Sequence, residues 1–304
     1  MLILSLFATA LAADPAPAPA ADVAPPMVAT VDSPAASGFA DSLMAAGDAY
    51  NALTWYRLAL YLDPARPDAD ALRFRVALAY ERGDRFPAAV YAYGQVGGSL
   101  ADDAAYRAAL ADFHAGNPLS ADVSLERLPL FYPDSELAPA AAYLRGVLAL
   151  ERKDLSAAEA RFAAFNVPDS ALAPKAAALA EAARAPVRTR APLLAGALSV
   201  VPGLGQLYAG HPGDAAMAAI VNIPVGVTSA LLLREGAQTG HTGVLVAGAI
   251  LGGAFVITYP SNLLGAYRGA LRANERERQL RAESLLGQAW DPSLMLDPDD
   301  VPLP

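Results

Sequence analysis

Three patterns of apolar and polar positions follow one another along the chain. From about residue 38 to residue 185, apolar residues recur at the spacing of amphipathic helices. Three runs between residues 190 and 268 then carry almost no charge, and each approaches the roughly 20 residues that cross a bilayer as a helix. Residues 269–288 alternate charged residues with leucines, which predicts a polar amphipathic helix. The pattern therefore predicts an all-α protein with a soluble part and a membrane part.

A repeat runs through the first helical region. Its phase is marked by four short turns, spaced by roughly 35 residues: Gly47-Asp48, Gly83-Asp84, Gly116-Asn117 and Lys153-Asp154. A small residue follows each turn, and a larger apolar residue usually comes four positions later: Ala52 and Tyr56, Ala89 and Tyr93, Ala121 and Leu125, Ala158 and Phe162. Small residues let two helices approach closely while the larger one fills the gap, so these eight are the predicted packing residues.

This period and these residues resemble tetratricopeptide (TPR) repeats. The segment 132–175, with Tyr132-Pro133-Asp134-Ser135, Gly146, Ala158 and Phe162, looks like repeats of periplasmic proteins in the outer-membrane assembly and Tol-Pal systems. The resemblance implies a TPR-like helical-repeat solenoid over 38–185 that binds a protein or peptide. The second unit fits only with a one-residue insertion near Phe86. The alternative is an alanine-rich helical bundle without a true repeat.

The charge-poor runs predict a short helical transmembrane bundle at 190–268, with segments at about 191–209, 214–233 and 243–266. The alternative is a helical hairpin buried in a soluble domain. The first segment contains a distinctive motif formed by Pro202, Gly203, Gly205, Gln206, Tyr208 and Gly210. Pro202 removes a backbone donor and the glycines permit a bend, so this segment is expected to be kinked or re-entrant.

The motif resembles the Pro-Gly-x-Gly-Gln-x-Tyr-x-Gly signature of a bacterial membrane domain of unknown function (the DUF5683 type), and it is similar to the glycine-rich entry of TM2 domains. In the first family the last helix commonly ends in Asp-Ala-Tyr-Arg. Here the matching residues are Gly265-Ala266-Tyr267-Arg268, so the acid is replaced by Gly265. Neither resemblance implies a reaction.

The two ends of the chain have their own compositions. Residues 1–13 form a short apolar run ending in Ala10-Leu11-Ala12, which predicts a signal peptide, although no basic residue precedes the run. A disordered or truncated start is the alternative. Residues 14–37 are rich in Pro and Ala and predict a disordered linker. Residues 289–304 combine prolines with acids and predict a disordered acidic tail.

Composition and charge disfavour several kinds of partner and binding site. The chain has 304 residues, 55% of them hydrophobic, and a net charge of -9, which disfavours a nucleic-acid partner. It has no cysteine and three histidines, His114, His211 and His241, in separate regions, so we expect no catalytic residue, no bound metal and no cofactor.

These features together predict a non-enzymatic scaffold of the bacterial cell envelope. It would lie in the inner membrane with the repeats in the periplasm, and would bind an envelope protein or peptide through them. The alternative is a component of a small oligomeric transporter or channel, because Gly248-x-x-x-Gly252 and Gly265-x-x-x-Gly269 could pack helices of a homo-oligomer. Five arginines follow the last apolar run and three precede the first, which favours three crossings over a re-entrant first segment.

Overall fold

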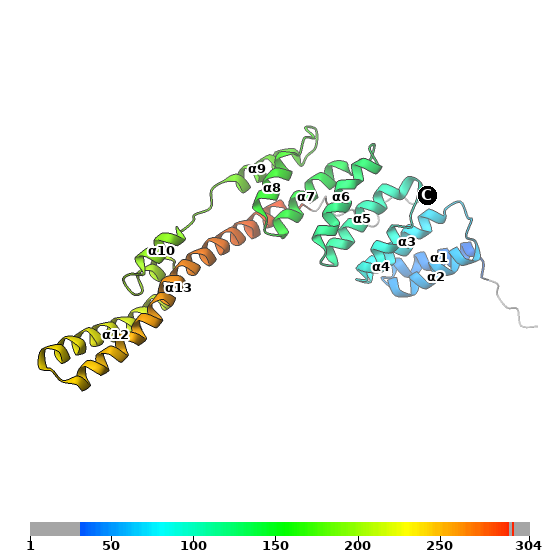
Figure 1. Ribbon diagram of the computed structural model, residues 1–304. Helices are drawn as coiled ribbons and strands as arrows, with labels where there is room; N and C mark the ends of the chain where they lie inside the picture. The colour runs from blue at the N-terminus through cyan, green and yellow to red at the C-terminus, as the bar shows by residue number, and fades with distance from the viewer. Residues whose placement is uncertain (1–30, 292–293, 295–304) are drawn as a thin grey trace, which may run out of the picture.

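A computed structural model describes residues 31–291 and residue 294, and within them every regular element is a helix (Figure 1). The helices of the repeat region are α1 (Ser33–Ala45), α2 (Ala49–Leu62), α3 (Ala69–Arg82), α4 (Phe86–Tyr93), the short 3-10 helix η1 (Gly98–Leu100), α5 (Ala101–His114), α6 (Pro118–Phe131), α7 (Ala138–Glu151), α8 (Leu155–Ala163) and α9 (Ala173–Arg184). The apolar region contains α10 (Pro192–Leu198), α11 (Leu204–Tyr208), α12 (Pro212–Thr239) and α13 (Thr242–Ala289).

Helices α1 to α9 form a stacked array in chain order. The first helices of the units, α1, α3, α5 and α7, pack against the second helices, α2, α4, α6 and α8, and each second helix also packs against the next unit. Figure 1 shows the units laid side by side, with α9 closing the series. The expected all-α, TPR-like helical-repeat solenoid is confirmed by this arrangement.

The turn inside each unit is set by one left-handed residue. Gly47, Asp84, Gly116 and Lys153 all have positive φ, between 54° and 83°. After each of them, the next backbone N–H donates back across the turn, as from Asp154 to the carbonyl of Ala149 at 3.0 Å. In the second unit this residue is Asp84, not Gly83, whose φ is -92°. The expected insertion near Phe86 is therefore wrong, since Ala89 follows Asp84 by the same five positions that separate Ala121 from Gly116.

The helices of each unit approach closely at the predicted small residues. All eight predicted packing residues are buried, with exposed fractions of 0–2%. The closest approach is at Gly146 on α7, where an added Cβ would lie 2.5 Å from the ring of Phe162. Glycine is therefore required there, because any side chain would push α8 away from α7.

The array begins earlier than expected. Ser33–Ala45 is helical, so the linker expected to run to residue 37 ends before α1 in the part of it that the structure describes. Asp32 caps α1 by accepting from the N–H of Ala35 at 2.8 Å, and Pro34 lies in the first turn, where a missing N–H costs nothing.

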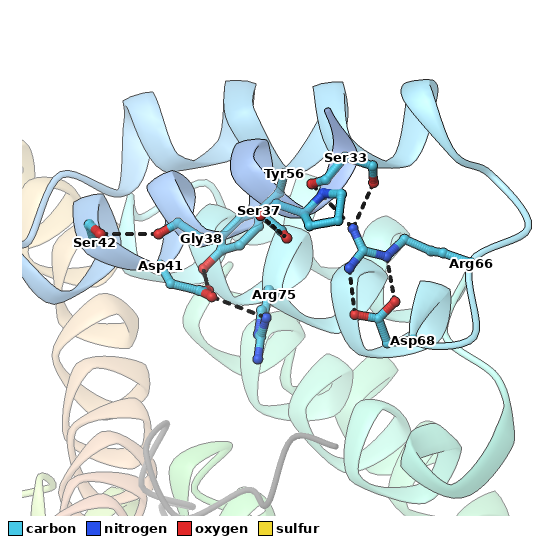
Figure 2. Close-up of polar contacts among 10 residues, drawn as sticks. Ser33, Ser37, Gly38, Asp41, Ser42, Tyr56, Arg66, Asp68 and Arg75 are labelled. Carbon is cyan, nitrogen blue, oxygen red and sulfur yellow. Dashed lines mark hydrogen bonds and ion pairs between the residues drawn. The ribbon is translucent and has the colours of Figure 1, made fainter. Parts of the chain in front are cut away.

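Polar contacts with α2 and with the loop after it fix α1 in place (Figure 2). The hydroxyl of Ser33 donates to the carbonyl of Ala59 at 2.8 Å and accepts from Arg66 at 2.8 Å. The Tyr56 hydroxyl donates to Asp41 at 2.7 Å, and burial raises the pKa of this phenol well above its usual range. These bonds tie the polar ends of α1 to α2 and to the loop after it.

The first apolar segment is not one helix. It divides into α10 and α11, of seven and five residues, joined by a turn at Gly203 whose φ is 93°. Neither is long enough to cross a bilayer. The expected bend is therefore present, but the expectation of three full crossings is not met.

The third apolar segment and the polar helix after it, which were expected to be separate, form a single helix. Helix α13 runs unbroken for 48 residues through both the apolar segment and the polar helix, a length of about 72 Å. Helices α12 and α13 are the two that are long and apolar enough to cross a membrane within the residues described here. They pack as an antiparallel hairpin, and the polar half of α13 returns to the array (Figure 1).

Three expectations concern residues that the structure does not describe. The signal peptide at 1–13 and most of the linker lie outside residues 31–291, as do nearly all residues of the acidic tail. The tail was expected to start at 289, but Ala289 ends α13, and Trp290, Asp291 and Leu294 contact the array.

Candidate functional site: the groove that holds the end of α13

The polar half of α13 and the residues that follow it lie in a groove of the array. Helix α13 packs against α7 and α9, and Trp290 and Leu294 contact α5. Two buried tyrosines line the groove, and they occupy the same place in successive units: Tyr106 and Tyr143 each lie ten positions before the left-handed residue, Gly116 or Lys153. Each hydroxyl donates to a backbone carbonyl of the returning segment. Tyr143 bonds Ala289 at 2.8 Å and Tyr106 bonds Leu294 at 2.9 Å.

These hydrogen bonds suit the end of a helix. The last carbonyls of a helix have no partner within it, and Ala289 is the last residue of α13. A buried tyrosine hydroxyl therefore satisfies a group that would otherwise be orphaned. Burial also raises the pKa of Tyr143 and of Tyr106 well above the usual value, so both stay protonated donors. The equivalent residue of α3 is Phe74, which has no hydroxyl.

Apolar contacts fill the rest of the groove. Leu285, Ala289 and Leu294 are almost fully buried and belong to the same apolar cluster as Leu179 and Ala183 of α9. The ring of Trp290 lies 6.3 Å from that of Phe113 on α5. Buried leucines contribute most of the stabilisation in such a contact, because each removes its whole side chain from water.

Polar contacts border the groove and fix its register. The Lys153 ammonium pairs with Glu283 at 2.8 Å, and this contact raises the pKa of Lys153. Lys175 pairs with Asp291 at 3.0 Å, and Arg281 donates to the carbonyl of Ala182 at 2.7 Å. Both ion pairs are partly exposed to solvent, which screens them, so they orient α13 more than they hold it.

The groove therefore contains a helix end followed by a short extended segment, both from the same chain. Repeat grooves commonly bind a partner's helix or peptide in this way. This part of the array is thus occupied in cis by the end of the same chain. The sequence pattern of α13 showed an apolar stripe containing Leu285, but nothing local showed what would cover it.

The predicted membrane motif forms a second packed site, beside the middle of α13. An added Cβ at Gly205 would lie 2.0 Å from both the Ala195 carbonyl and the Ser199 hydroxyl, so α11 can touch α10 only with glycine there. Gly203 needs its left-handed φ to reverse the chain, and Gly210 has a positive φ of 85° where α11 ends. Pro202 lies in the turn between α10 and α11.

Gln206 lies at the centre of this site. Its amide nitrogen donates to the backbone carbonyl of Asn262 at 2.9 Å and also contacts the Asn262 side-chain oxygen. The Gln206 side-chain oxygen accepts from Ser199 at 3.3 Å, and Tyr259 donates to the carbonyl of Val200 at 2.5 Å. Ser199, Gln206 and Asn262 are buried between helices, where an unpaired polar group would be costly, whereas the bond from Tyr259 lies at the surface. The network thus fastens the α10–α11 turn to α13.

The base of the α10–α11 hairpin is fastened in the same way. Asn274 of α13 accepts from the backbone N–H of Arg190 at 2.7 Å and donates to its carbonyl at 2.9 Å. The Tyr208 hydroxyl accepts from the N–H of Ala191 at 3.1 Å. The chain thus enters and leaves this hairpin at one level of α13. No sequence motif includes Asn262, Asn274 or Tyr259 in such a role, although polar residues in or beside an apolar run are a signal for such contacts.

The three histidines lie apart. His114 stacks on Phe86 at 5.3 Å, His211 lies 3.3 Å from the carbonyl of Gly269, and His241 precedes α13. No cluster of three or more His, Cys, Asp or Glu residues with metal-binding geometry occurs among residues 31–291 and 294.

Comparisons with known proteins assign this chain to no family. No family model matches the chain, and no curated protein matches its sequence. Among solved structures, a tetratricopeptide repeat protein from Parabacteroides merdae ATCC 43184 aligns with 16% identity over 86% of this chain and 95% of its own, at a TM-score of 0.40. The motif around Gly205 therefore stays a resemblance to the DUF5683 and TM2 domains.

Proposed function

We propose that this protein is a non-enzymatic, membrane-anchored scaffold of the bacterial cell envelope, which holds a TPR-like array at the surface of the inner membrane. The observation that carries the proposal is the continuity of α13. One half of this helix forms the apolar hairpin with α12, and the other half lies in the groove of the array. The helix thus acts as a strut that fixes the array to its anchor.

Exposed apolar surface supports a membrane anchor. Only 11% and 6% of the most apolar windows of α12 and α13 are buried by the rest of the chain. Side chains such as Ile220 and Ile257 are 67% and 78% exposed. A core helix of a soluble protein would bury most of this surface, whereas a lipid bilayer would cover it without a partner protein.

The anchor places the array and the end of α13 on one side of the membrane, because they contact each other. The side is proposed to be the periplasm, as the apolar run at 1–13 predicts export. Arginines near the spans favour the cytoplasm: eight lie on the array side (Arg184, Arg188, Arg190, Arg268, Arg272, Arg276, Arg278 and Arg281) and Arg234 lies near the tip of the hairpin. We give the predicted export signal more weight than the arginine distribution, because large domains cross the membrane largely regardless of their charge.

A protein partner would use a face of the array other than the filled groove. Helix α6 exposes Leu119, Leu130 and Phe131 by 65–75%. Exposed apolar groups of this size, gathered on one helix, are typical of surfaces that bind another protein. The partner is proposed to be an envelope protein or peptide.

Two measurements test the scaffold against a channel. The full chain should stay in the membrane pellet at alkaline pH, and release into the supernatant would overturn the anchor. Blue-native electrophoresis of the detergent-solubilised chain, with and without the array, then separates the two functions. Assembly with other proteins that requires the array supports the scaffold, whereas a homo-oligomer formed by the hairpin alone supports a channel component.

A further inference from the structure

Four arginines lie on one face of α13 and beside it, where the apolar surface of the helix ends. We define the arginine collar as Arg190, Arg268, Arg272 and Arg276. Asn274 holds the backbone of Arg190 from both sides, so Arg190 lies at the level of that residue on α13. At 1.5 Å per residue, the other three lie within about 9 Å of this level along the helix axis.

The collar borders exposed apolar side chains. Leu193 of α10 and Leu264 and Leu271 of α13 are all exposed, and they lie beside or below the collar on the side of the hairpin. In the proposed membrane orientation this places the four guanidinium groups at the level of the lipid headgroups. The inference rests on that orientation.

The collar arginines form no ion pair with the described residues. Three carboxylates lie at this level: Glu275, which accepts from Gln279 at 3.4 Å, Glu277, and Asp214 in the first turn of α12, where His211 contacts Gly269. With Arg278 counted alongside the collar, five guanidinium groups exceed these three carboxylates. At the other end of the hairpin Arg234 is followed by Glu235, and the charges balance. The excess of positive charge is thus confined to the array side.

The spacing suits a row of phosphates. Arg268, Arg272 and Arg276 follow one another at four-residue intervals, so they form one stripe with steps of about 6 Å. A guanidinium binds a phosphate oxygen pair in a bidentate manner, and partial exclusion of water strengthens the contact. We propose that the arginine collar binds the phosphate groups of anionic phospholipids, in the leaflet next to the array.

The test uses the purified full-length chain in a neutral detergent. Short-chain phosphatidylglycerol, phosphatidylcholine of equal chain length and inorganic phosphate are added separately, and thermal unfolding is followed by circular dichroism. Phosphatidylglycerol at tenfold excess over its Kd is expected to raise the Tm by about 3 °C, with smaller shifts for the other two additions.

Two matched triple variants locate the effect. Arg268→Gln, Arg272→Gln and Arg276→Gln together should abolish most of the shift, whereas Arg85→Gln, Arg127→Gln and Arg234→Gln, with the same change in charge, should retain it. The corresponding triple Lys variant of the collar should keep part of the shift, because the charge remains but bidentate binding is lost.

Three results would overturn the proposal. An equal shift in both triple Gln variants would mean that the collar is not the site. An equal shift with phosphatidylcholine would assign the effect to the acyl chains, and an equal shift with inorganic phosphate would assign it to a free-anion site. Complete loss of the shift in the Lys variant would instead show that the guanidinium geometry is required in addition to the charge, which supports bidentate binding. Failure of the anchor itself is separate, since it would appear as release from the membrane at alkaline pH.

Discussion

Replacing Leu285 by Ala should release the end of α13 from its groove. Leu285 is 3% exposed and packs within the cluster that contains Tyr143 and Leu179. Truncating a buried leucine costs about 2–5 kcal/mol through lost burial and the cavity left behind. The ion pairs around it are screened by solvent and cannot offset that loss.

Trypsin cleavage after Arg281 measures this release. Arg281 lies within the docked helix, and its guanidinium is bonded to the carbonyl of Ala182. Cleavage there requires local opening, so its rate follows the population of the undocked state when reclosing is fast. A loss of 2 kcal/mol raises that population about 30-fold.

Leu280→Ala is the matched control for this prediction. Leu280 lies in the same helix next to the cleavage site but is 50% exposed, so its truncation should change the rate by no more than about twofold. Mass spectrometry of the 281–282 bond in the full chain gives both rates. Equal rates in the two variants would refute the conclusion that burial of Leu285 holds α13 in the groove.

Three further substitutions test the close contacts. Gly205→Ala should lower the Tm and break the α10–α11 turn. Gly213→Ala is the control, because nothing lies within 4 Å of the added Cβ, and it should leave the Tm unchanged. Similar Tm values for the two variants would contradict the close contact of α11 with α10. Gly146→Ala should destabilise the array by about 1–3 kcal/mol in urea unfolding, compared with little change for Gly38→Ala. Asp154→Ala should cost about 1 kcal/mol by removing a helix cap. Because the pKa of Asp154 is lowered below 3.8, that contribution is present above this pH and is lost as the pH falls further, and a pH-independent difference would contradict it.

Local packing could be predicted from the sequence because it leaves a local pattern. The spacing of Ala158 and Phe162 reflects two helices in contact, and their burial follows from that spacing. The bend at Gly203 could be predicted for the same reason, because proline and glycine change the conformations open to their own backbone. The left-handed conformation of Asp84 was harder to predict, because an aspartate enters that region only when the surrounding turn holds it there.

Contacts between distant segments leave no such pattern. Tyr143 and Ala289 are 146 positions apart, and neither residue type indicates the other. The amphipathic pattern predicted that Leu285 would be covered, but an apolar stripe does not identify its cover. The number of crossings could not be predicted for a related reason. The first charge-free run has the composition of a membrane span, but contact between Gly205 and Ala195 folds it back on itself.

Cysteine labelling from one side of the membrane tests the central claim most directly. The chain has no cysteine, so single variants report one position each: Asp134→Cys in the array, Ser284→Cys at the end of α13 and Gln238→Cys near the hairpin tip. With a membrane-impermeant maleimide on intact spheroplasts, the account predicts labelling of the array and the α13 end together, and protection of the tip until the membrane is opened. Labelling of the array and the end of α13 from opposite sides would contradict the strut, and labelling of the tip alone would reverse the proposed orientation.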